Sequence, residues 1–291
     1  MFYSAASPKD AQQVLDAGAS EILVSFHYLQ KRKEAFMDII NQIQDRDGVF
    51  MTDSGAFSAF MGDNVNERTE EFWLPYLERY VEFLTVNCKK IHVAANLDLD
   101  NIVGRDIVDK WNEKYFHPLE KIVNITYVTQ KDINKMYGDL TGLHRFKEYC
   151  NLYKYVGVNA WMKPHISTIV AQAKIKKIRI HGFAWTDKAV MNYPVFSVDS
   201  SSWLSGQRYG STYRYDGKNF RAYDKKSKFR RKVWKVEMEE SGMDYEGVMN
   251  DEQEAVTLFN ANQWLGWGEE FRKRANCILT NREVNYYFNK K

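Results

Sequence analysis

Acidic residues stand just beyond three short apolar segments of this sequence. Asp53 and Asp199 each come directly after such a segment, and Asp98 lies three residues beyond another. Two carboxylates that face one cavity can divide labour, because one stays ionised as a nucleophile while burial or a like charge keeps the other protonated. Such a pair suits cleavage of a glycosidic bond by double displacement, through a covalent sugar–enzyme intermediate.

Further polar residues, glycines and aromatics stand at the same ends of neighbouring apolar segments. The candidates for substrate contacts are Ser54, Gly55, Phe57, Asn96, Asp98, Gln130, Gly157, Val158, Asn159, His181, Gly182 and Trp203. Taken singly, many have a simpler explanation: an Asp or Ser after a strand commonly caps the next helix, a His in an apolar segment commonly belongs to the core, and a Gly commonly serves a turn. Their coincidence favours one shared site.

The apolar segments alternate with segments of helical period, which predicts strands separated by helices. The predicted strands are Phe2–Ala5, Ile22–Phe26, Val49–Thr52, Ile91–Ala95, Val123–Val128, Tyr155–Val158, Ile178–Phe183 and Val195–Val198. The predicted helices are Pro8–Ala17, Lys33–Ile43, Glu70–Leu84, Ile107–Leu119, His144–Asn151, His165–Ala173, Asp187–Asn192 and Asp251–Ala275. This order predicts an α/β fold, the TIM (β/α)8 barrel, whose active site lies at the carboxyl ends of the strands. An open doubly wound sheet is the alternative, although no Gly-rich phosphate loop follows the first strands.

A length of 291 residues suffices for one such barrel and an extension. We expect a catalytic barrel over residues 1–204 and an extension over 205–291 that packs on it. The cysteines, Cys88, Cys150 and Cys277, form no C-x-x-C pair, so we expect no metal, no other cofactor and a reducing compartment. Because neither a signal peptide nor a membrane-spanning apolar stretch is visible, we expect a cytoplasmic protein that does not bind membranes.

The extension is basic and rich in aromatic residues. From Arg214 to Lys235 there are ten Lys or Arg against two Asp, a local charge of +8 in a chain of net charge +3. The candidate nucleic-acid contacts are Arg208, Arg214, Lys218, Arg221, Lys225, Lys226, Lys228, Arg230, Arg231 and Lys232. Such cations neutralise phosphates, and the interleaved aromatics Phe220, Tyr223, Phe229 and Trp234 can stack on bases. A solvated basic face, with aromatics that anchor the extension to the barrel, is the alternative.

Two motifs carry a resemblance to a known family. The segment TDSGAF at 52–57 resembles the TDSGGF segment of tRNA-guanine transglycosylases. The segment VDSSSW at 198–203, preceded by HGF at 181–183 and YP at 193–194, is similar to short phage and bacterial relatives that place 7-deazaguanines into DNA. The resemblance covers about residues 48–203, and the combination of motifs is more specific than any one of them.

The resemblance implies a role for five residues. Asp199 would attack C1′ of the guanosine, and Asp53 would shuttle protons to the leaving base and from the incoming one. Asp98 would accept hydrogen bonds from the ring N–H and exocyclic amine of a guanine-like base, and Gln130 would contact its carbonyl edge. The backbone of Gly157 would line the base pocket.

The sequence also departs from the family. Val158 and Ala56 stand where relatives have glycine, which puts the backbone of the pocket in doubt, and the C-x-C-x-x-C zinc motif of the tRNA enzymes is missing. The resemblance therefore favours exchange of guanine in single-stranded or base-flipped DNA for a free 7-deazaguanine such as preQ0. The alternatives are a tRNA substrate, a non-catalytic nucleic-acid-binding barrel, or a glycoside hydrolase that acts on free sugars. The oligomeric state stays open.

Overall fold

The computed structural model describes residues 1–56, 69–227 and 232–278. Eight parallel strands close into a barrel in chain order, and β8 pairs with β1. The strands are β1 (Phe2–Ala5), β2 (Glu21–Ser25), β3 (Val49–Asp53), β4 (Val93–Ala95), β5 (Asn124–Val128), β6 (Tyr155–Val158), β7 (Arg179–Gly182) and β8 (Ser197–Ser200). The predicted TIM (β/α)8 barrel is confirmed, with every predicted strand present and its ends shifted by at most two residues.

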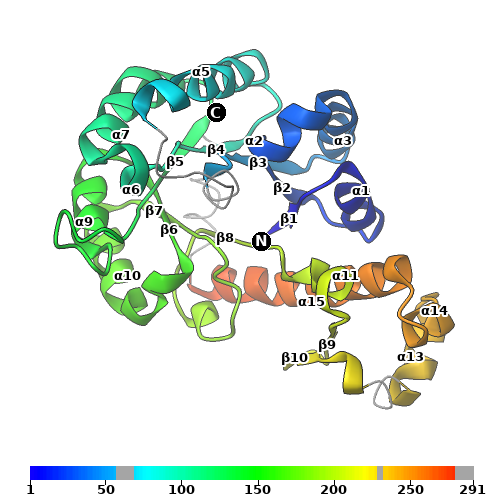
Figure 1. Ribbon diagram of the computed structural model, residues 1–291. Coiled ribbons are helices and arrows are strands. Elements are labelled where there is room, and N and C mark those ends of the chain that lie inside the picture. Colours follow the sequence, from blue (N-terminus) through cyan, green and yellow to red (C-terminus); the bar gives the residue numbers. More distant parts are fainter. Residues whose placement is uncertain (57–68, 228–231, 279–291) are drawn as a thin grey trace.

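Helices surround the barrel (Figure 1). The main ones are α1 (Pro8–Asp16), α3 (Lys33–Asp45), α5 (Glu70–Val86), α7 (Arg105–Trp111), α9 (Leu143–Leu152), α10 (Ile166–Lys176) and α15 (Gln253–Ile278). A π-helical turn (Asn112–Phe116) and α8 (His117–Leu119) continue α7. At α1, the side chain of Ser7 caps the helix by accepting a hydrogen bond from the N–H of Asp10 at 3.1 Å. None of the helices in the described ranges is both long and apolar enough to span a lipid bilayer.

One predicted helix is wrong. Between β7 and β8, where Asp187–Asn192 was expected to be helical, the structure has only a 3-10 turn over Val190–Asn192. The long helix α15 packs against this turn and against α1, so it covers the barrel where the missing helix would lie (Figure 1). A segment so short cannot form an amphipathic helix of several turns, whereas α15 supplies a long covering surface.

The alternation of side chains along the strands puts an apolar floor below the residues at the carboxyl ends of the strands. Five buried side chains, one from each of five strands, form a cluster in the barrel interior: Phe2, Leu23, Met51, Val93 and Tyr155. Two residues further along a strand, the side chain points to the same face. The barrel therefore presents Ser4, Ser25, Asp53, Ala95 and Gly157 above the floor, at the carboxyl ends of the strands.

The C-terminal extension is folded and joined to the barrel. A hairpin of β9 (Thr212–Tyr215) and β10 (Phe220–Tyr223) packs on α15. The short helices α11 (Ser205–Tyr209), α13 (Lys235–Glu240) and α14 (Tyr245–Met249) complete this part of the chain. From β1, the hydroxyl of Tyr3 donates to the carbonyl of Trp264 at 3.1 Å. The contact joins the first strand of the barrel to α15.

A buried arginine fixes the segment that follows β4. In α9, Arg145 donates through Nε to Asp100 at 3.0 Å, and its two terminal nitrogens contact Asp109 at 2.8 and 2.9 Å. Asp100, only 3% exposed, begins the short helix α6 (Asp100–Val103). The guanidinium also lies over the ring of Tyr149, 4.4 Å from its centroid. The carboxyl end of β4 is thereby tied to the neighbouring helix layer.

We expect Arg145→Met to lower the free energy of unfolding by about 3–5 kcal/mol, because the buried Asp100 would lose the cation that is hydrogen-bonded to it. Urea unfolding followed by circular dichroism measures this change. Lys147→Met on the exposed face of the same helix is the matched control, with an expected change within about 0.5 kcal/mol. Adding Asp100→Asn to Arg145→Met should restore part of the loss; equal stability of Arg145→Met and the control would contradict the assignment.

Candidate active site at the carboxyl ends of the strands

Asp199 lies within β8 and is held by neighbours on both sides. Ser4 of β1 donates from its hydroxyl to Asp199 Oδ2 at 2.8 Å, and the backbone N–H of Ala184 donates to Oδ1 at 3.0 Å. His181 Nε2 lies 3.4 Å from Oδ1. Asp199 is 9% exposed, so the carboxylate sits in the barrel end with two donors that fix its orientation.

Asp53 is the last residue of β3, and the turn after it requires glycine. The backbone N–H of Gly55 donates to Asp53 Oδ1 at 2.8 Å. Gly55 has φ +76°, and a Cβ there would lie 2.6 Å from Cβ of His27, so no larger residue fits without a shift of the chain. Burial, and to a lesser degree the charge of Asp199, raises the pKa of Asp53 to about 6.

Asp98 and Gln130 meet at the ends of β4 and β5. The amide of Gln130 donates to Asp98 Oδ2, and the hydroxyl of Ser54 lies 3.5 Å from Oδ1. Burial raises the pKa of Asp98 to about 8; the Gln130 hydrogen bond opposes this shift, whereas the charges of Asp100 and Asp53 add to it. The three carboxyl groups therefore interact in series, from Asp199 to Asp53 and from Asp53 to Asp98.

Two buried tyrosines support these strand ends from the helix layer. In α5, the hydroxyl of Tyr76 donates to the carbonyl of Ser54, and that of Tyr80 donates to the carbonyl of Ala95 at 2.9 Å. Tyr80 is completely buried. The backbone that carries Asp53 is thus hydrogen-bonded to a rigid helix.

Gly157 faces the barrel interior, where a side chain would not fit. A Cβ on this residue would lie 2.8 Å from the ring of Phe183 and 3.3 Å from the hydroxyl of Thr126. Close packing therefore accounts for the glycine, and the role of its backbone in lining a base pocket stays a prediction. Phe183 itself was not among the predicted substrate contacts.

Two predicted substrate contacts are instead part of the packed interior. Asn96 is completely buried, and its amide donates to Asn112 at 2.9 Å and accepts from the N–H of Val128 at 2.7 Å. Trp203 is also completely buried, and its indole N–H donates to the carbonyl of Ser4 at 3.1 Å. Both side chains satisfy polar groups of the protein, so the structure assigns them to the scaffold.

The alternation along the strands turns two other predicted contacts outward. Val158 follows the inward-facing Gly157, so its buried side chain points to the helix layer. Gly182 also faces outward, where a Cβ would lie 2.6 Å from Cβ of Trp185. Asn159 is partly buried, and its amide donates to a backbone carbonyl of the loop after β5 at 2.9 Å.

His181 lies beneath Asp199 rather than in contact with solvent. Its ring is completely buried, and Nδ1 is hydrogen-bonded to the hydroxyl of Ser197 at 2.7 Å. Ser197 in turn is hydrogen-bonded to the hydroxyl of Tyr155 at 2.5 Å. This histidine therefore supports the carboxylate from inside the barrel, and the predicted substrate contact is replaced by a contact with Asp199.

Two donors to Asp199, Ser4 and Ala184, were missed by the sequence analysis. The position of Ser4 could have been predicted, because a residue two positions after the inward-facing Phe2 in a strand also points into the barrel. Ala184 carries none, because the donor is a backbone N–H in a loop and the residue has φ +55°.

Most of the predicted nucleic-acid contacts that the structure describes are exposed. These are Arg208, Lys218, Arg221, Lys226 and Lys232. Arg214 is partly buried and forms an ion pair with Glu237 at 2.6 Å. Phe57, Lys228, Arg230 and Arg231 lie outside the described residues, as do Phe229 and the side chain of Lys225.

The aromatic residues of the extension mainly hold it together. Trp234 is 6% exposed and stacks on Phe259, while Phe220 stacks on Trp267 with 5.1 Å between ring centroids. The expectation that Trp234 stacks on bases does not hold, because its ring belongs to the core of the extension. Anchoring aromatics, the alternative in the sequence analysis, describe this residue.

Among the described residues there is no cluster of three or more His, Cys, Asp or Glu side chains placed to hold a metal ion. No protein-family model matches the chain, and no curated protein matches it.

We expect the carboxyl group of Asp53 to titrate near pH 6, and to titrate at lower pH in Asp199→Asn, because that variant removes a neighbouring negative charge. Carbonyl-detected NMR titration with ¹³C-labelled aspartate measures both values. Glu240→Gln, which removes an exposed charge on α13, is the control and should leave the Asp53 titration unchanged. An Asp53 titration that is identical in wild type and Asp199→Asn would show that the two groups do not interact.

Proposed function

We propose that this protein is a DNA guanine transglycosylase, which exchanges guanine in DNA for a 7-deazaguanine such as preQ0. The observation that carries the proposal is the placement of Asp53 and Asp199 at one end of the barrel, close enough for the charge of one to raise the pKa of the other. Beside them, Asp98 and Gln130 form a hydrogen-bonded pair suited to a purine edge. The sequence resemblance supplies the substrate class.

In the first half of the reaction, an oxygen of Asp199 attacks C1′ of the target deoxyguanosine. The C1′–N9 bond breaks, its electron pair goes to the base, and a proton from Asp53 neutralises the leaving guanine. The hydrogen bonds from Ser4 and Ala184 hold the carboxylate of Asp199 in a fixed orientation for this attack. A covalent enzyme–deoxyribose ester results.

In the second half, the incoming base gives its N9 proton to the carboxylate of Asp53. Its nitrogen then attacks C1′, the ester bond breaks, and Asp199 is released as a carboxylate. Asp53 ends with the proton that it needs for the next cycle. A pKa of about 6 suits a group that must act as acid and base in turn near neutral pH.

Recognition of the base falls to Asp98 and Gln130. An ionised carboxylate accepts hydrogen bonds only, and so suits the ring N–H and exocyclic amine of a guanine-like base; an amide offers both a donor and an acceptor. In the free protein, Gln130 donates to Asp98. A bound base must therefore either displace Gln130 from Asp98 or form its own hydrogen bonds to Asp98 beside that of Gln130.

We expect wild-type protein to incorporate labelled preQ0 into guanine-containing DNA, and Asp199→Asn to lose both incorporation and the covalent adduct. Asp53→Asn should slow exchange about 10²–10⁴-fold, because proton transfer is lost. Nucleoside mass spectrometry measures incorporation, and denaturing gels detect the adduct. Asp38→Asn, an exposed aspartate of α3, is the control and should retain the wild-type rate.

The same assay separates the alternatives when single-stranded DNA, duplex DNA and tRNA are supplied in parallel. Incorporation into tRNA alone would establish the RNA substrate instead. Nucleic-acid binding without exchange or base release would support a non-catalytic barrel and would refute the proposed function.

We expect the affinity for free guanine to increase with pH up to about 8. Asp98 has a pKa of about 8 in the empty site, and a base that donates N–H groups binds the ionised form. Below that pH a proton must leave on binding, so the affinity should fall up to about tenfold per pH unit. Calorimetry in buffers of different ionisation enthalpy should detect the release of close to one proton at pH 7.

Asp98→Asn should abolish this pH dependence. Asp53→Asn, the matched change at the neighbouring carboxyl group, should retain it with the midpoint at lower pH, because the charge of Asp53 raises the pKa of Asp98. A wild-type affinity that does not change between pH 6 and 8 would exclude Asp98 as the acceptor for the base.

A further inference from the structure

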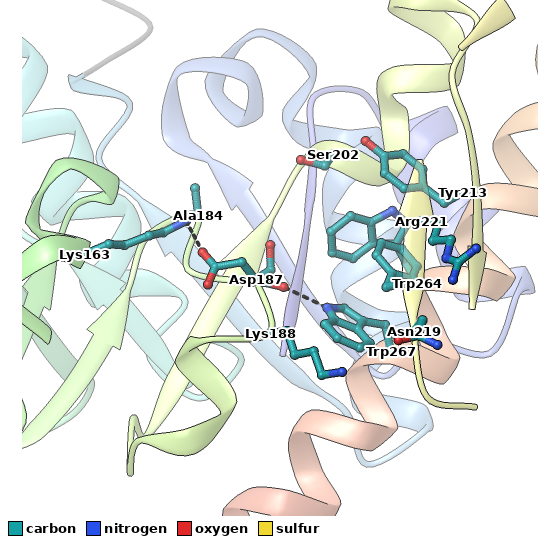
Figure 2. Close-up of a pocket in the computed structure, with 12 residues that line it drawn as sticks. Lys163, Ala184, Asp187, Lys188, Ser202, Tyr213, Asn219, Arg221, Trp264 and Trp267 are labelled. Carbon is teal, nitrogen blue, oxygen red and sulfur yellow. Dashed lines mark hydrogen bonds and ion pairs between the residues drawn. The ribbon is translucent and has the colours of Figure 1, made fainter. Parts of the chain in front are cut away.

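A pocket lies where the C-terminal hairpin meets the loops that follow β6, β7 and β8. Its volume is about 500 Å³, within the range of sites for small molecules. Figure 2 shows Lys163, Asp187 and Lys188 on one side, and Arg221 of β10 with Trp264 and Trp267 of α15 on the other. None of the roles assigned above to the barrel site accounts for this pocket.

The pocket adjoins the proposed nucleophile through a single residue. Ala184 lines the pocket and is exposed, and its backbone N–H donates to Asp199 Oδ1 at 3.0 Å. A chain molecule whose reactive unit lies at Asp199 therefore has this pocket as a neighbouring surface. Ser202, which follows β8, lines the same pocket.

The charge of the pocket favours an anion. Three cations, Lys163, Lys188 and Arg221, line it against one carboxylate, Asp187. Lys163 is ion-paired with Asp187 at 2.7 Å (Figure 2). Lys188 and Arg221 are exposed, and neither forms an ion pair with any other residue in the described part of the chain. Two cations are thus available for phosphate groups.

The opposite wall is aromatic and rigid. The ring of Phe220 is stacked between Tyr213 and Trp267, with centroid distances of 5.2 and 5.1 Å. Trp264 and Trp267 are only 4% and 2% exposed, so the accessible surface of this wall comes from the partly buried Phe220 and Tyr213. The indole N–H of Trp267 donates to the carbonyl of Thr186 at 2.7 Å (Figure 2), which ties this wall to the β7–β8 loop.

We propose that this pocket binds the DNA nucleotide that flanks the reactive one, with Lys188 and Arg221 on its phosphates and the aromatic wall beside its base or sugar. The assignment of the flanking position rests on the proposed function. Cations beside aromatic rings are the combination with which proteins hold single strands without base pairing. An uncharged sugar would leave Lys188 and Arg221 without a partner.

The experiment measures binding of a fluorescein-labelled single-stranded 12-mer with one central guanine, by anisotropy over a range of salt concentrations. In Lys188→Gln/Arg221→Gln, Kd should rise roughly 10- to 30-fold at 0.1 M salt. The slope of log Kd against log salt should fall by about 1.4, because two phosphate contacts are lost. In the exchange reaction, KM for the oligonucleotide should rise while kcat is unchanged.

The matched control is Lys174→Gln/Lys176→Gln, which removes the same charge from the exposed end of α10 that leads into β7. If both double variants bind with the same affinity and salt slope, the pocket assignment is overturned, even when base exchange is intact. If wild type binds through Lys188 and Arg221 but exchanges no base, the proposed function fails while the pocket remains a single-strand site. Binding of tRNA but not of the oligonucleotide also overturns the assignment.

Discussion

Three carboxyl groups share one partly buried end of the barrel, and the rest of the site depends on how their mutual repulsion is balanced. Bringing like charges together away from water costs free energy unless donors or protons compensate. Asp199 receives hydrogen bonds from Ser4 and the backbone N–H of Ala184. Asp98 receives them from the amide of Gln130 and the hydroxyl of Ser54. Asp53 receives one from the backbone N–H of Gly55, and the hydroxyl of Ser25 also lowers its pKa. At Asp53 and Asp98 these donors only oppose the effect of burial, which raises the pKa of both carboxyl groups. Burial and neighbouring charges thus give chemically identical groups different pKa values.

That arrangement is possible because the barrel separates its two tasks along each strand. The lower positions, such as Phe2 and Met51, fill the interior with apolar side chains. The positions two residues later carry Ser4 and Asp53, which face the same way but end above this packed layer. The apolar side chains thus fill one level of the barrel and the polar groups of the proposed site occupy the next, so these groups gather at the rim without opening the core.

The sequence predicted the strands well, because each is a short apolar segment bounded by polar residues. The sequence also predicted that Asp53, Asp98 and Asp199 lie at the same end of the barrel, because parallel strands all run in one direction. Its errors concern side-chain direction and distant packing. Side chains alternate between the two faces of a strand. Because Gly157 was expected to face the site, its neighbour Val158 should have been predicted to point outward. The burial of Trp203 could not be read in this way, because the residue lies beyond β8 and its environment comes from remote segments.

The least predictable feature is that the end of the barrel with the candidate site depends on α15. The N–H that orients Asp199 belongs to Ala184, a residue in a left-handed conformation that alanine seldom adopts. Two residues later, the carbonyl of Thr186 accepts the indole N–H of Trp267, so the loop is held by a residue of α15 that lies 81 residues further along the chain. Local sequence patterns cannot predict a contact between residues so far apart in the chain. The C-terminal extension consequently supports the loop that orients Asp199 and also forms a wall of the adjoining pocket. A change in the packing of α15 would therefore alter both the position of this loop and the shape of the pocket.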